Sequence, residues 1–103
     1  MKDLIVAVCS CPAGVAHTYM AADKFSDVAS SMGYDVKVET QGMAGIEDRL
    51  TDDDLKKAKW IVLANEVKLR DSERFDNYSE KVIQAKLGDL LHEPRLFIQN
   101  HLK

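Results

Sequence analysis

Cysteine is scarce in this chain, and long apolar runs are missing. The two cysteines, Cys9 and Cys11, lie too close in sequence to brace a fold by a disulfide. No stretch approaches the ~18 consecutive apolar residues that a membrane-spanning helix needs. Met1-Lys2-Asp3 leads straight into a short apolar run, with no secretory signal before the cysteines, so we expect a reduced, cytoplasmic setting.

The sequence also lacks an excess of charge of either sign. Lys and Arg number 14 against 17 Asp and Glu, for a net charge of -3, and the two signs are interspersed. This pattern argues against a basic patch for nucleic acid. Because 103 residues suffice for one hydrophobic core but not two, we predict a single domain spanning residues 1–103.

Apolar residues recur in patterns typical of strands and helices in turn. The predicted strands are 4–8, 34–40, 60–64 and 81–85, and residues 41–45 read as a loop. The predicted helices are 15–32, 51–58, 72–78, 86–92 and 94–102, with Gly33 ending the first, Thr51 capping the second and Pro94 beginning the last. Asp52, Asp53 and Asp54 are interpreted as partners of the helix dipole rather than metal ligands.

Alternating strands and helices favour a parallel sheet with right-handed crossovers. Strands 4–8 and 60–64 are wholly apolar and should be central, whereas the other two are partly polar and should lie at the edges. We therefore predict an α/β, single-domain three-layer sandwich with a four-stranded parallel sheet, order 2-1-3-4, and helices on both faces. Ligands bind such a sheet outside the carboxyl ends of its strands, near the switch point where Cys11 falls.

The segment Cys11-Pro12-Ala13-Gly14-Val15-Ala16-His17-Thr18 connects the first predicted strand to the first helix. The unpaired N–H groups and the dipole of a helix N-terminus attract phosphate or thiolate. Gly14 allows close approach, and Pro12 stiffens the entry. A thiol placed here has a lowered pKa and is a better nucleophile, although Cys11 is also compatible with a buried structural role.

His17 and Thr18 at the end of this segment each allow two interpretations. A protonated His17 adds charge and a donor to an anion site, or its ring is held by a main-chain carbonyl. The hydroxyl of Thr18 donates to the anion or bonds within the first helical turn.

Three functions fit such a segment: a phosphoryl carrier, a cysteine phosphatase, and a thiol redox or metal site. A phosphatase normally closes the loop with Arg, and here His17 holds that position, with no Arg before Arg49. A redox pair usually reads Cys-x-x-Cys, and Cys9, Cys11 and His17 are too few for a zinc site, so we predict no metal.

The strings CPAGVAHTYMAA, VETQG, LTDDDLKKA and ERF resemble the enzyme IIB component of the fructose family of the bacterial phosphoenolpyruvate-dependent sugar phosphotransferase system, and the likeness runs from about residue 4 to the last helix. The resemblance implies that Cys11 accepts a phosphoryl group from a phosphohistidine of enzyme IIA. It also implies transfer to a sugar held by the membrane protein IIC, which largely selects the sugar. The chain would then be a cytoplasmic phosphotransferase without a cofactor, associated with the membrane through IIC.

The resemblance extends to a candidate partner surface and has two departures. It implies that Glu39, Gln41 and Gly42, with the pair Arg74-Phe75, belong to this surface, and Arg74 is interpreted as an ion-pair or partner-surface residue rather than a phosphate ligand. Ala13 stands where Thr is common in the family, so the loop lacks a hydroxyl. Asn65-Glu66 places the acidic residue one position later than in relatives, which weakens any role for residue 65.

Overall fold

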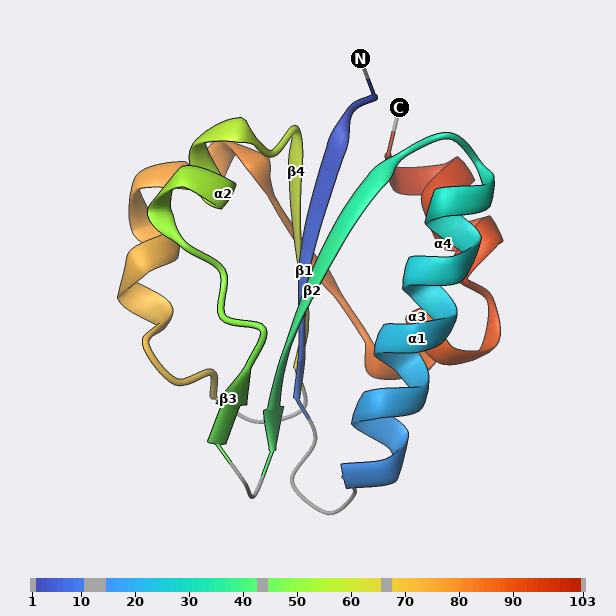
Figure 1. Cartoon of the computed structure of the whole chain (residues 1–103), viewed down its shortest axis with the longest axis horizontal. Helices are drawn as coiled ribbons and strands as arrows, with labels where there is room; N and C mark the ends of the chain where they lie inside the picture. The colour runs from blue at the N-terminus through green and yellow to red at the C-terminus, as the bar shows by residue number, and fades with distance from the viewer. Residues whose placement is uncertain (1, 11–14, 43–44, 66–67, 103) are drawn as a thin grey trace.

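The computed structural model describes residues 2–10, 15–42, 45–65 and 68–102 of the chain. Strands and helices alternate along much of it (Figure 1). The strands are β1 (Leu4–Ser10), β2 (Asp35–Gly42), β3 (Gly45–Glu47), β4 (Trp60–Asn65) and β5 (Val82–Ala85). The helices are α1 (Val15–Ser31), α2 (Asp52–Lys57), the 3₁₀ helix η1 (Ser72–Lys81), α3 (Leu87–His92) and α4 (Pro94–His101).

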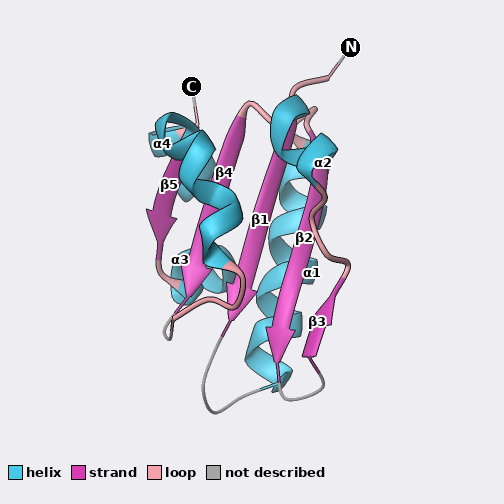
Figure 2. Cartoon of the chain, turned by 90° about the vertical axis from the view of Figure 1, so that its left-hand side faces the viewer, coloured by secondary structure: helices cyan, strands magenta, loops and turns pink. Residues whose placement is uncertain are grey.

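The described strands form one mixed sheet in the order β3-β2-β1-β4-β5 (Figure 2). β1 pairs in parallel with β2 and β4, β4 pairs in parallel with β5, and β3 pairs antiparallel with β2. In this register Ser10, the last residue of β1, lies between Gln41 of β2 and Asn65 of β4. The carboxyl ends of three neighbouring strands therefore meet beside the residue that precedes Cys11.

The predicted four-stranded, all-parallel sheet in the order 2-1-3-4 is wrong. A fifth strand, β3, runs antiparallel to β2 and makes the sheet mixed. Its three residues are too few to show the alternation by which a sequence reveals a strand. The expected loop at 41–45 is also wrong in part, because Gln41 and Gly42 belong to β2 and Gly45 begins β3, while Met43 and Ala44 lie outside the described residues.

Helices cover both faces of the sheet, with α1, α3 and α4 on one face and α2 and η1 on the other (Figure 1). We call these the α1 face and the η1 face. Because side chains of a strand point alternately to the two faces, β1 contributes to both cores. Its residues Ile5, Ala7 and Cys9 are buried on the α1 face, whereas Val6 and Val8 are buried on the η1 face.

Local signals account for several helix boundaries. Thr51 caps α2 as predicted, since its hydroxyl accepts the Asp54 N–H at 3.2 Å while the Asp54 carboxylate accepts the Thr51 N–H at 2.8 Å. Gly33 follows α1 with φ 95°, and Pro94 begins α4, both as predicted. The helix predicted at 72–78 is instead a 3₁₀ helix that continues to Lys81. Within the described ranges, no helix has the length and apolarity to cross a membrane.

Candidate functional site

The segment expected to bind an anion is described in its second half. Cys11, Pro12, Ala13 and Gly14 lie outside the described residues. β1 ends at Ser10, and the first turn of α1 runs from Val15 through Thr18. A strand and a helix thus flank the segment, and the side chains at the start of α1 lie next to it in sequence.

Thr18 in this first turn carries an unsatisfied hydroxyl. The residue is 1 % exposed, and among the described residues its Oγ1 has no hydrogen-bond partner. Among the described residues, therefore, no bond within the helical turn, one of the two roles considered for this side chain, is made. Leaving a buried hydroxyl unpaired costs about 1–3 kcal/mol, so a persistent orphan at a helix N-terminus points to a ligand that accepts a hydrogen bond.

His17, the neighbouring residue, is exposed. It lines a surface groove of about 540 Å³ between α1 and α3, together with Met20, Lys24, Leu91 and His92 among others. The described residues give its ring no hydrogen bond or ion pair. His17 therefore faces solvent at the helix start, and no described main-chain carbonyl holds its ring.

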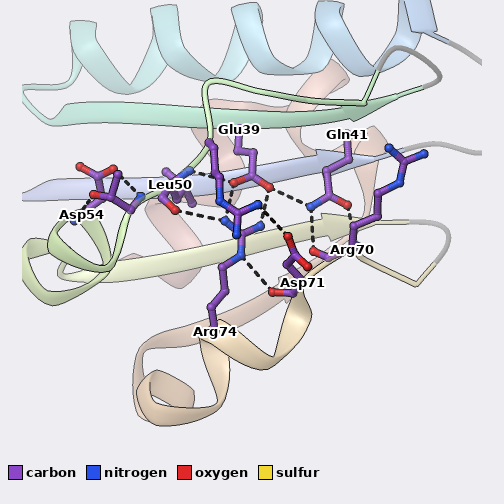
Figure 3. A network of polar contacts seen from close by, with 9 residues as sticks. Glu39, Gln41, Leu50, Asp54, Arg70, Asp71 and Arg74 are labelled. Atoms are coloured by element: carbon purple, nitrogen blue, oxygen red, sulfur yellow. Dashed lines mark hydrogen bonds and ion pairs between the residues drawn. The ribbon is translucent and has the colours of Figure 1, made fainter.

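An ion pair between Glu39 of β2 and Arg74 of η1 lies at the centre of a polar network on the η1 face (Figure 3). Arg74 donates from Nη1 to Oε1 at 2.7 Å and from Nη2 to Oε2 at 2.6 Å, a bidentate geometry. The Glu39 side chain is fully buried, and that of Arg74 is 15 % exposed. Burial alone raises the pKa of Glu39, but hydrogen bonds from Arg74, Gln41 and the Leu50 N–H outweigh it and lower this pKa.

Gln41 connects the ion pair to the segment before η1. Its Nε2 donates to Oε2 of Glu39 at 2.8 Å and to the carbonyl of Arg70 at 3.1 Å. Its Oε1 accepts the Arg70 N–H at 2.8 Å. The buried amide therefore binds both main-chain groups of Arg70, much as a paired strand does.

The residue after Arg70 is held by two arginines. Asp71 adopts φ 53°, the left-handed conformation. Its carbonyl accepts from Nε of Arg74 at 3.0 Å, and its carboxylate accepts from Nη1 of Arg49 at 2.7 Å. The hydrogen bond from Arg49 lowers the pKa of Asp71. Side chains from three parts of the chain thus fix the turn that leads into η1.

The residues expected to form a partner surface divide into two groups. Glu39, Gln41 and Arg74 come together in one network, and the ion-pair role considered for Arg74 is observed. Phe75 is buried in the core of the η1 face, with the Arg74 guanidinium 4.7 Å from its ring centroid. Gly42 lies outside this network, paired with Gly45 of β3. Glu39, Gln41 and Phe75 are buried and can shape a surface by supporting its exposed neighbours.

Cys9 has a very different environment from the start of α1. Its side chain is fully buried in the apolar core of the α1 face. Burial raises the pKa of this thiol to about 12. At neutral pH the sulfur therefore keeps its proton, and in this form it is a poor nucleophile.

Sequence reasoning missed four members of the network, Arg49, Leu50, Arg70 and Asp71. The available signal was Glu39, because a carboxylate facing a core needs partners. Arg70 gives no such signal, since Gln41 recognises its main chain rather than its side chain.

Comparison with known proteins identifies the family and supports the fold. The family model described as PTS system, Lactose/Cellobiose specific IIB subunit, matches residues 6–99. The chain belongs to the PTS IIB family. The protein is 46% identical over 85 residues to the PTS system fructose-like EIIB component 2 of Escherichia coli (strain K12), which covers 82% of this chain and 78% of the relative. It is 42% identical over 91 residues to the fructose-like EIIB component 1 of the same strain, covering 88% of this chain and 82% of the relative.

Solved structures of PTS proteins share the whole architecture of this IIB component. A solution structure of the enzyme IIB subunit of the PTS system from Escherichia coli K12 is 39% identical, with a TM-score of 0.87, and covers 97% of this chain and 91% of that one. A domain of the fructose-specific iiabc component from Borrelia burgdorferi is 37% identical, also with a TM-score of 0.87, and covers 97% of this chain and 93% of that one.

These relationships define the general reaction of the protein. The resemblance to fructose-like IIB components seen in the sequence is confirmed. As a fructose-like PTS IIB component, the protein has a phosphotransfer role in sugar uptake. IIB components act as phosphotransferases and work with IIA and IIC partners.

Proposed function

We propose that the protein carries a phosphoryl group on Cys11, accepting it from a phosphohistidine of IIA and passing it to a sugar bound by IIC. The observation that carries this proposal is the buried hydroxyl of Thr18 in the first turn of α1, which has no hydrogen-bond partner among the described residues. That hydroxyl lies in the helical turn that follows the β1–α1 connection, where an anion gains from the helix dipole and from unpaired N–H groups. A phosphoryl group supplies the hydrogen-bond acceptor that Thr18 lacks.

The rest of segment 11–18 has supporting roles in this proposal. Main-chain N–H groups of Ala13, Gly14, Val15 and Ala16 surround the phosphoryl oxygens, and Pro12 stiffens the entry. His17, which is exposed at the same helix start, adds a donor and positive charge when protonated. Because Ala13 lacks a hydroxyl, the Thr18 hydroxyl is the neutral side-chain donor in this segment, beside the donor that a protonated His17 adds.

The transfer proceeds in two displacements at phosphorus. The Cys11 thiolate attacks the phosphorus, the sulfur–phosphorus bond forms, and the nitrogen–phosphorus bond of the phosphohistidine breaks. The released electron pair stays on the imidazole nitrogen, which takes up a proton. A sugar hydroxyl oxygen then attacks the same phosphorus and loses its proton, and the sulfur leaves as the thiolate that began the cycle.

The environment of Cys9 supports the choice of Cys11. A thiol with a pKa of about 12 stays protonated at neutral pH and buried behind α1. Cys11 is the other thiol of the chain and directly follows Ser10 in the sequence, and Ser10 ends β1 at the side of the sheet where ligands bind in parallel sheets. The carrier therefore needs one cysteine.

The decisive experiment compares Cys11→Ser with Cys9→Ala. Each variant is incubated with phosphoenolpyruvate, the general transfer proteins, IIA, IIC and sugar, and phosphocysteine is located by mass spectrometry. Cys11→Ser should fold and lose sugar phosphorylation, because serine is a poorer nucleophile at neutral pH. Cys9→Ala should keep it. Sugar phosphorylation near the wild-type rate in Cys11→Ser rejects the proposal.

A second experiment tests the hydroxyl that carries the proposal. Thr18→Val replaces an orphan hydroxyl by a methyl group of similar size, so thermal stability should stay equal or rise. Phosphoryl transfer should slow about tenfold, since a hydrogen bond to a charged group is lost. Thr18→Ser, which keeps the hydroxyl, is the matched control. Wild-type transfer by Thr18→Val contradicts the role of this residue.

A further inference from the structure

Arg70 combines a fixed main chain with a charged side chain that has no partner among the residues that the structure describes. Gln41 binds its N–H at 2.8 Å and its carbonyl at 3.1 Å. Gln41 is itself held by Glu39, whose carboxylate is held by Arg74 and by the Leu50 N–H. Within the described residues the exposed Arg70 guanidinium makes neither a hydrogen bond nor an ion pair. A buried network thus fixes the main chain of Arg70, and the exposed guanidinium extends from this fixed point.

Arg70 lies at the end of the sheet where β1 and its parallel neighbours have their carboxyl ends. Gln41 lies opposite Ser10 in the β1–β2 register, and Ser10 directly precedes Cys11. Figure 3 shows the Arg70 side chain extending past Gln41 toward the carboxyl ends of the strands. The guanidinium therefore belongs to the same end of the molecule as the start of α1.

Two other arginines on the η1 face already form ion pairs with carboxylates. Arg74 is occupied by Glu39, and Arg49 is paired with Asp71. A planar guanidinium matches two oxygens of a phosphoryl group, and such charge-assisted bonds are the stronger ones. Among the described residues at this end of the sheet, Arg70 has the guanidinium that remains available for an anionic ligand.

We propose that Arg70 contacts the phosphoryl group during transfer, and that Gln41 is a positioning residue that sets the place of Arg70. This inference rests on the proposed function at Cys11. As the sulfur–phosphorus bond forms and the donor nitrogen–phosphorus bond breaks, the guanidinium binds two non-bridging oxygens without gaining or losing a proton. When the sugar oxygen displaces the sulfur, the electron pair returns to sulfur and the phosphoryl group leaves Arg70 with the sugar.

The main test is Arg70→Gln, with two variants that make the same change of charge. Lys68→Gln alters an exposed cation on the same segment, and Arg95→Gln alters one on α4. Arg70→Gln should slow phosphoryl transfer at least about tenfold with an unchanged thermal midpoint, because its main-chain bonds to Gln41 remain. Both control variants should transfer within about twofold of the wild type, and Arg70→Lys should be intermediate because it keeps charge but not the fork.

Measurements without partners separate contact with the phosphoryl group from docking of IIA. On the phosphorylated protein alone, Arg70→Gln should shift the ³¹P resonance of phosphocysteine and change its rate of hydrolysis, whereas Lys68→Gln should change neither. A slower reaction with IIA but an unchanged resonance and hydrolysis rate would overturn the contact. Equal transfer by Arg70→Gln and Arg95→Gln would overturn the whole inference.

The role of Gln41 is tested by coupling. Gln41→Met should slow transfer in the wild-type background and add little in the Arg70→Gln background, because both changes remove the same contact. Equal slowing in both backgrounds would overturn the positioning role. If Gln41→Met does not fold, the Arg70 variants alone decide the contact. Wild-type protein that is phosphorylated elsewhere than at Cys11 rejects the proposed function, whereas Cys11 phosphorylation unaffected by Arg70→Gln rejects this inference alone.

Discussion

On the α1 face, apolar side chains from α1, α3, α4 and the sheet pack into one cluster around Phe25, which contacts Phe97 edge-to-face with ring centroids 6.4 Å apart. On the η1 face a smaller apolar cluster adjoins the buried pair of Glu39 and Arg74. Burying apolar surface stabilises a fold, whereas burying charges costs free energy that a good geometry only offsets. We interpret the α1 face as the main source of stability and the η1 face as the part that fixes chain positions near the site.

The largest effect on stability is expected from Phe25→Ala. Removing a fully buried ring leaves a cavity in the α1 face, so the free energy of unfolding should fall by about 3–5 kcal/mol. Phosphoryl transfer per folded molecule should change little, because the polar network lies on the other face. Urea denaturation and transfer assays measure the two effects. A folded Phe25→Ala protein with strongly reduced transfer would break the division between the faces.

Glu39→Gln should have the second largest effect on stability. The free energy of unfolding should fall by about 3 kcal/mol, since Arg74 is left largely buried without its carboxylate partner. Unlike Phe25→Ala, this change should also slow transfer per folded molecule, because Gln41 and hence Arg70 lose their support.

The double variant Glu39→Leu with Arg74→Leu sharpens this contrast. Replacing a buried ion pair by apolar residues is often neutral for stability, so urea denaturation should show most of the loss recovered. Transfer should remain slow, because no carboxylate holds Gln41. Recovery of both stability and transfer would show that the network has no positioning role.

Acid should weaken the η1 face before the α1 face. The pKa of Glu39 is lowered in the folded protein relative to about 4.3 in an unfolded chain. The carboxylate therefore contributes stability above this value, and the contribution is lost as the pH falls through the folded pKa. Unfolding free energy measured from pH 6 to 3 should drop less steeply in Glu39→Gln than in the wild type, while Phe25→Ala keeps the wild-type slope. Equal slopes in all three proteins would contradict the assignment.

The smallest effect is expected for Cys9→Ala on the α1 face. The thiol packs as a small hydrophobe, so its loss should cost about 1 kcal/mol and leave transfer intact. With a pKa of about 12, Cys9 should also resist alkylation in the folded wild-type protein at pH 7–8. Peptide mapping after alkylation measures this, and rapid labelling of Cys9 at that pH would show that its burial is not maintained.

The sequence predicted those parts of the fold that local patterns determine. The apolar runs in β1 and β4, the glycine after α1 and the Thr51 cap each act within a few residues, and each is found. β3 has three residues and is held by pairing with β2. A segment this short shows no alternation of polar and apolar residues from which a strand could be predicted. The two hydrogen bonds between Gln41 and Arg70 use the main-chain groups of Arg70, which the fold brings to Gln41. The identity of the side chain at position 70 therefore does not predict them.

The short β3 is the outer strand of the sheet on the side of β2, and its length affects how the sheet meets other molecules. An exposed strand edge is a template for self-association, and short edge strands reduce that hazard. After Glu47 the chain turns through Asp48, whose φ of 53° is incompatible with continued extended structure. A strand that pairs with the outer edge of β3 therefore finds three residues, which limits self-association at β3 itself.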